Sequence, residues 1–115
     1  MKKLLTLAVV FAITCIACSK GTDNISTTVD CSDVSVSFVT QVSPLVQSTC
    51  ATSTSCHATG SSNGPGALLS YQQIYNARTA IRIAVGNGIM PQNSSLSNTQ
   101  KNIILCWIDN GATNN

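Results

Sequence analysis

Six cysteines in a chain of 115 residues constrain this fold more than any other feature. Two of them end an apolar N-terminal run, and the other four lie in the body of the chain: Cys31, Cys50, Cys56 and Cys106. A folded core of roughly 80 residues is marginally stable unless covalent links or a bound group support it. In an oxidising compartment the four cysteines allow two disulfides, or one disulfide plus two thiols bonded to a prosthetic group.

The N-terminus has the pattern of an export signal. Lys2 and Lys3 precede a run over residues 4–13 that is apolar except for Thr6. This run is too short for a stable membrane span, and it predicts a secretory signal peptide.

The end of this signal resembles a bacterial lipobox, because the small Ala17 precedes Cys18. The resemblance implies cleavage before Cys18 and lipidation of that cysteine, whereas cleavage without a lipid is the alternative. We therefore expect an exported, membrane-anchored lipoprotein at the outer membrane or facing the periplasm. The expected organisation is a signal peptide (1–17), a flexible tether rich in small polar residues (18–33) and a folded domain (34–115).

Charge is scarce along the whole chain, at 9% of residues against the usual quarter. After cleavage the two signs balance: Lys20, Arg78, Arg82 and Lys101 against Asp23, Asp30, Asp33 and Asp109. Nothing in this pattern provides the clustered basic face that nucleic acid requires. Electrostatic steering toward a charged partner should also be weak.

The body of the chain predicts an all-α domain of three to four short helices with long loops. Alternating polarity over residues 34–38 suggests a short extended segment first. Ser43 and Pro44 then have the residue types of a helix cap and a first helical position, and this helix should end near Cys50. A loop rich in Ser, Thr, Asn and Gly follows, over residues 51–66.

Two further helical stretches are expected in the middle of the chain, from Ser70 to about residue 76 and over residues 78–85. The last helix has the clearest pattern, because Ser97 and Gln100 form a capping-box pair and apolar residues follow at helical spacing. Gly111 is a good helix stop.

The dipeptide Cys56-His57, with Cys50 upstream and Met90 downstream, has the residue types of a cofactor-binding site. A c-type haem uses such a pair, with the thiol bonded to the porphyrin and the imidazole bound to iron. The chain has one histidine, and Met90 is the one methionine expected to remain after export. If haem binds here, its axial ligands are therefore named by elimination.

Residues 42–112 resemble small monohaem cytochrome c domains, in particular those of bacterial exported lipoproteins. The matching segments follow the order of the family: Val42-Ser43-Pro44-Leu45-Val46, Cys50…Cys56-His57, Leu69-Ser70-Tyr71, Gly88-Ile89-Met90-Pro91 and Trp107-Ile108-Asp109-Asn110-Gly111-Ala112. The resemblance implies a cytochrome c-like fold and an electron carrier rather than an enzyme, with an unidentified redox partner protein.

By this resemblance the cofactor is one haem c, with thioethers from Cys50 and Cys56. His57 is then the proximal iron ligand and Met90 the distal one. The family normally has two residues between the thioether cysteines, whereas five lie between Cys50 and Cys56 here. The longer spacer must bulge, and attachment through Cys56 alone is the alternative.

Other interpretations of these residues stay open at this stage. Cys50 and Cys56 suit a small-loop disulfide, which would make the protein a haem-free, disulfide-stapled binding or interaction module. A haem peroxidase ranks last, because it needs an open sixth position and a distal acid or base. Arg78 and Arg82 suit either haem propionates or a solvated helix face. A Cys31–Cys106 disulfide is plausible by elimination.

Overall fold

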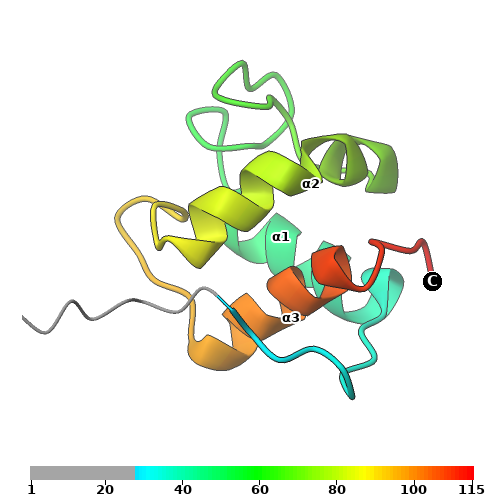
Figure 1. The fold of residues 1–115 in the computed structure, drawn as a ribbon. Coiled ribbons are helices and arrows are strands. Elements are labelled where there is room, and N and C mark those ends of the chain that lie inside the picture. Colours follow the sequence, from blue (N-terminus) through cyan, green and yellow to red (C-terminus); the bar gives the residue numbers. More distant parts are fainter. Residues whose placement is uncertain (1–27) are drawn as a thin grey trace, which may run out of the picture.

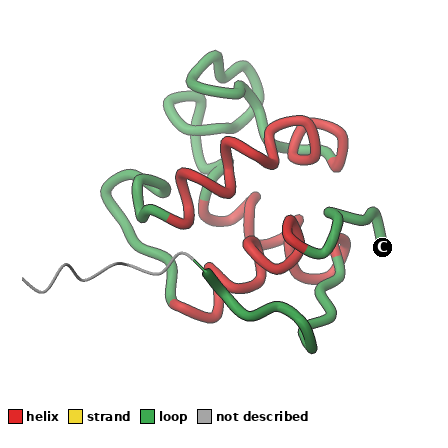
Figure 2. Tube along the Cα trace, viewed as in Figure 1, coloured by secondary structure: helices red, strands yellow, loops and turns green. Residues whose placement is uncertain are grey.

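The structure is a computed structural model that describes residues 28–115. Its described part is helical and contains no strand (Figures 1 and 2). The elements are a π-helix η1 (Phe38–Val42), which runs directly into α1 (Ser43–Thr49), then α2 (Tyr71–Gly86) and α3 (Asn98–Asp109). The expected all-α class is therefore confirmed. The predicted signal peptide, the Cys18 lipidation site and most of the predicted tether lie outside the described residues.

Both long helices begin at the serines that the sequence predicts, and each has a capping box, although one is expected from the sequence only for Ser97 and Gln100. The Ser70 hydroxyl accepts from the Gln73 backbone N–H, and the Gln73 side chain accepts from the Ser70 N–H. Ser97 and Gln100 make the same reciprocal pair at the start of α3. Such boxes satisfy backbone donors that a helix start otherwise leaves unpaired.

The expected break near residue 77 is wrong, because α2 is one continuous helix of 16 residues. No glycine or proline interrupts it, and Ala77 is buried on its inner face. The Gln72 side chain also donates to the Asn76 side chain one turn later, across 2.7 Å. Packing of its apolar face therefore stabilises one continuous helix where the sequence pattern predicted two.

The start of α1 also differs from the expectation. The chain is already helical at Val42, and the cap lies earlier, where the Ser37 hydroxyl accepts from the Thr40 N–H. Ser43 is therefore the first residue of α1 rather than its cap, and its hydroxyl accepts from the Gln47 side chain. The extended segment predicted over residues 34–38 gives way to helix at Phe38.

The main core is built from buried residues of η1, α1, α2 and α3. Trp107 is 2% exposed, and its ring centroid lies 5.4 Å from that of Phe38 and 6.4 Å from that of Tyr71. Its indole N–H donates to the Thr113 carbonyl oxygen across 2.9 Å. A second buried group joins the end of α2 to α3: Val85, Leu96, Ile104 and Leu105.

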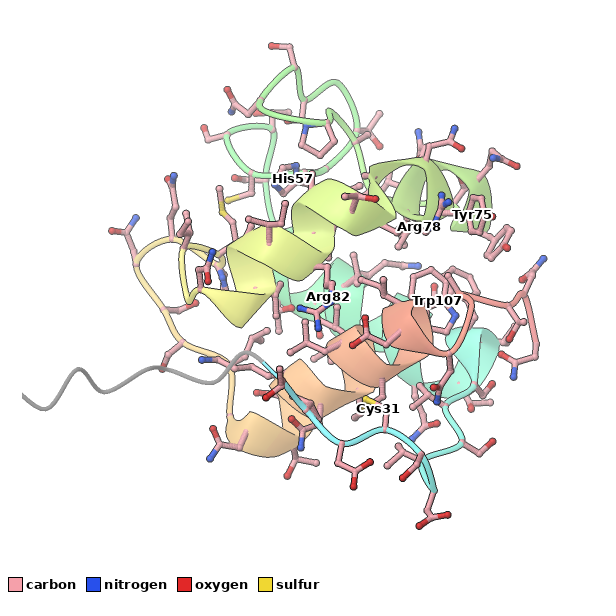
Figure 3. All side chains as sticks on the ribbon, in the orientation of Figure 1. Cys31, His57, Tyr75, Arg78, Arg82 and Trp107 are labelled. Atoms are coloured by element: carbon pink, nitrogen blue, oxygen red, sulfur yellow. A yellow bond between two sulfur atoms is a disulfide. The ribbon has the colours of Figure 1, made fainter. Side chains whose placement is uncertain are left out.

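The segment before η1 is fastened to α3 by a disulfide between Cys31 and Cys106 (Figure 3). The Asn110 side-chain amide also donates to the carbonyl oxygens of Cys31 and Val34. The Cys31–Cys106 disulfide, which the sequence makes plausible by elimination, is therefore present in the structure. Among residues 28–115, no helix has both the length and the apolar character needed to cross a membrane.

Candidate functional site

A cavity of about 640 Å³ lies between the loop after α1, helix α2 and the loop that precedes α3. All four residues predicted to hold a cofactor line it: Cys50, Cys56, His57 and Met90. Apolar side chains from α1, α2, α3 and their loops form much of the remaining wall: Val46, Leu68, Ile81, Val85, Leu96 and Ile104. The volume lies within the range of small-molecule and cofactor sites.

The five-residue spacer forms a compact turn that brings its two ends together. The His57 backbone N–H donates to the Cys50 carbonyl oxygen across 3.0 Å. Inside the turn, the N–H groups of Cys56 and Ala58 both donate to the Ser53 carbonyl oxygen. The bulge expected from the long spacer is thus a hydrogen-bonded structure, and it places both cysteines at the same cavity.

His57 is buried, with 9% of its surface exposed, and its ring is held in one orientation. Its Nδ1 lies 2.8 Å from the Gly66 carbonyl oxygen. Because a carbonyl oxygen only accepts, Nδ1 carries a proton, and in the neutral imidazole Nε2 is then the ring nitrogen with a free lone pair. Nε2 has no hydrogen-bond partner within residues 28–115. A histidine fixed through Nδ1 in this way is the usual arrangement of a metal-binding imidazole.

The two thiols are free, so the alternative disulfide between Cys50 and Cys56 is not formed in the structure. The pKa values of the two thiols are shifted in opposite directions. Burial raises the pKa of the Cys50 thiol, although a hydrogen bond with Thr49 acts against this. The hydroxyls of Ser53 and Thr52 lower the pKa of the Cys56 thiol by hydrogen bonding to it. Cys56 is therefore the more readily ionised and the more nucleophilic of the pair.

Met90 reaches the cavity from the loop that follows α2. The backbone N–H groups of Ile89 and Met90 both donate to the Ala84 carbonyl oxygen, which folds this loop back onto the helix end. Gly88 has a φ of +68°, a conformation that side chains disfavour, and it makes this reversal. The side chain of Met90 is partly buried, and its thioether sulfur is a soft donor.

Neither arginine of α2 lines the cavity, so of the two alternatives for these residues the pairing with haem propionates is not supported. The Arg78 guanidinium carbon lies 3.9 Å from the Tyr75 ring centroid, and Arg82 forms an ion pair with Asp109 at 2.7 Å. The described lining contains no Asp, Glu, Lys or Arg. Neutral polar groups take their place along one part of it: Gln92, Ser94, Ser95 and Gln100.

The sequence did not single out these residues as part of a site. Gln92, Ser94 and Ser95 come from a loop with no distinguishing motif, and the sequence marks Gln100 only as the partner of Ser97 in a capping box. Among residues 28–115, no group of three or more His, Cys, Asp or Glu side chains forms a metal site by itself. The chain matches no protein-family model, no curated protein and no solved structure.

Proposed function

We propose that this protein transfers electrons one at a time through a single c-type haem held in the cavity. The observation that carries the proposal is the convergence of Cys50, Cys56, His57 and Met90 on one cavity, although 40 positions separate the first from the last. A bound haem would supply an iron that alternates between ferrous and ferric states.

The donor set fits such a group. Cys56 and Cys50 would hold the porphyrin through their sulfur atoms, with Cys56 the more reactive. His57 would bind iron through Nε2, since Nδ1 is engaged by the Gly66 carbonyl oxygen. Met90 would provide the sixth ligand, and a thioether is a weak donor that favours the ferrous state.

The apolar part of the lining would keep water away from the haem. Leucine and isoleucine side chains from both long helices and the adjoining loops line the cavity. An apolar surrounding disfavours added charge on the iron and therefore raises its reduction potential. Two protein ligands would leave no open position for a substrate, which fits a carrier rather than an enzyme.

The proposal is tested by exporting the chain in a host with a cytochrome c maturation system and measuring the spectrum and midpoint potential. We expect Met90→Ala to keep its haem but to have a markedly lower potential. Ile89→Ala is the matched control, because Ile89 is 57% exposed and does not line the cavity. A protein that binds no haem would contradict the proposal. So would a Met90→Ala variant with an unchanged potential.

A further inference from the structure

Three asparagines in the described part of the chain are followed by glycine: Asn63, Asn87 and Asn110. In such a pair the glycine nitrogen can attack the side-chain amide carbon, because no side chain on the glycine hinders the approach. From the sequence alone, the three pairs are expected to react at similar rates. The structure separates them by the hydrogen bonds that hold the attacking nitrogen and the amide under attack.

The Asn110 pair is the most restrained. Its side-chain amide donates to the carbonyl oxygens of Cys31 and Val34, at 3.2 and 2.9 Å. The N–H of Gly111 donates to the Ile108 carbonyl oxygen across 3.1 Å. The attack would therefore have to break bonds on both groups, and each broken bond adds to the barrier.

The Asn87 pair is restrained at the nucleophile. The N–H of Gly88 donates to the Val85 carbonyl oxygen across 3.1 Å, at the end of α2. Asn87 itself is the C-cap of that helix, and its own N–H donates to the Ile83 carbonyl oxygen. Reaction here would require the helix end to open.

The Asn63 pair differs in its nucleophile. The N–H of Gly64 makes no hydrogen bond within residues 28–115, and both residues lie exposed in the loop that follows His57. A single bond holds the Asn63 amide, which donates to the Ser55 carbonyl oxygen across 2.8 Å. Of the three pairs, this is the one in which the attacking nitrogen has no hydrogen bond to break.

We propose that Asn63 is a site of spontaneous deamidation selected by the fold. The Gly64 nitrogen bonds to the Asn63 side-chain carbon, and the amide nitrogen leaves as ammonia with the proton from Gly64. Water then opens the resulting succinimide at either carbonyl, which yields aspartate or isoaspartate. No oxidant or reductant is needed.

The modification would alter the cavity. A carboxylate cannot donate to the Ser55 carbonyl oxygen, so the bond that joins the two sides of the loop around His57 is lost. Asn63 is also part of a described lining that contains no Asp, Glu, Lys or Arg, and its product would bring a carboxylate to that wall. This inference does not depend on the haem proposal.

The test is incubation of the folded protein at mildly alkaline pH, with peptide mass spectrometry to follow conversion of amide to acid at each site. We expect Asn63 to convert several-fold faster than Asn87, because its attacking nitrogen has no hydrogen bond to break, and Asn110 to be the slowest, because bonds on both of its reacting groups must break. In reduced protein unfolded in urea the three rates should converge. Equal rates in the folded protein would overturn the proposal, as would a lead by Asn87 or Asn110. Asn63→Gln should abolish the fast phase and leave the other two rates unchanged.

Discussion

The His57 N–H donates to the Cys50 carbonyl oxygen across 3.0 Å, which closes a turn over the five residues between the two cysteines. The five-residue spacer is thereby folded so that both thiols and the imidazole reach one cavity. The sulfur chemistry of this turn gives the first prediction.

Cys56 should react before Cys50 with a thiol alkylating agent in the protein without cofactor. Its pKa is lowered by the Ser53 and Thr52 hydroxyls, so a larger fraction is thiolate at neutral pH, whereas burial raises the pKa of Cys50. As pH rises, Cys56 should gain reactivity first and Cys50 at higher pH. Combined Ser53→Ala and Thr52→Val changes should raise the pKa of Cys56 and slow its labelling. Peptide mapping of short labelling reactions measures both rates, and faster labelling of Cys50 would contradict the assignment.

The disulfide should provide a large share of the stability, because it closes a loop across a sequence separation of 75. Removing it as Cys31→Ala with Cys106→Ala should lower the free energy of unfolding by about 2–5 kcal/mol. Urea unfolding followed by Trp107 fluorescence measures this. The comparison uses a Cys50→Ser, Cys56→Ser background so that no other thiols pair. A change below about 1 kcal/mol would be too small for a cross-link of this span.

Arg82 and Asp109 should contribute little stability and no cofactor binding. Both side chains are about 30% exposed, although the guanidinium contacts both carboxylate oxygens, at 2.7 and 2.9 Å. A double-mutant cycle with Arg82→Gln and Asp109→Asn should give a coupling of about 0.2–1 kcal/mol at low salt. Haem content of the exported protein should not change in either variant. A loss of haem in Arg82→Gln would contradict this prediction and show that Arg82 contributes to haem binding.

Trp107 should be among the most costly core residues to truncate. It is nearly fully buried between Phe38 and Tyr71, and its N–H is bonded to the Thr113 carbonyl oxygen. Trp107→Ala should cost about 3–5 kcal/mol of unfolding free energy, and Trp107→Phe clearly less, because it keeps most of the packing. Chemical unfolding followed by circular dichroism compares the two, and equal costs would mean that packing does not set the effect.

The parts of this fold that local sequence governs could be predicted, and those that distant contacts govern could not. Ser70 and Ser97 begin helices through bonds to residues three positions on, so their pattern is visible in sequence. The π-helix at Phe38 was not predicted, because its first N–H donates to the side chain of Asn115 at the other end of the chain. Arg82 likewise finds Asp109 only once α2 and α3 pack.

The residues of the candidate site also divide into those with a distinctive sequence pattern and those without one. Cys56-His57 could be picked out because adjacent thiol and imidazole are chemically distinctive, and Met90 because it follows Gly88 and precedes Pro91. The neutral lining residues from the loop between α2 and α3, such as Gln92 and Ser94, carry no such signal. They become part of the cavity only through the path of the loop between α2 and α3.

The most direct measurement of the central proposal is whether haem stays with the chain after denaturation. The exported protein is boiled in detergent, separated on a gel and stained for haem peroxidase activity, beside Cys50→Ala, Cys56→Ala and Ser55→Ala variants. The proposal predicts haem in the wild-type and Ser55→Ala bands and its loss or strong reduction in Cys56→Ala, with Cys50→Ala showing whether the second thioether forms. A colourless wild-type band, from a host that matures a control cytochrome c, would contradict covalent haem and leave a disulfide-stapled binding module.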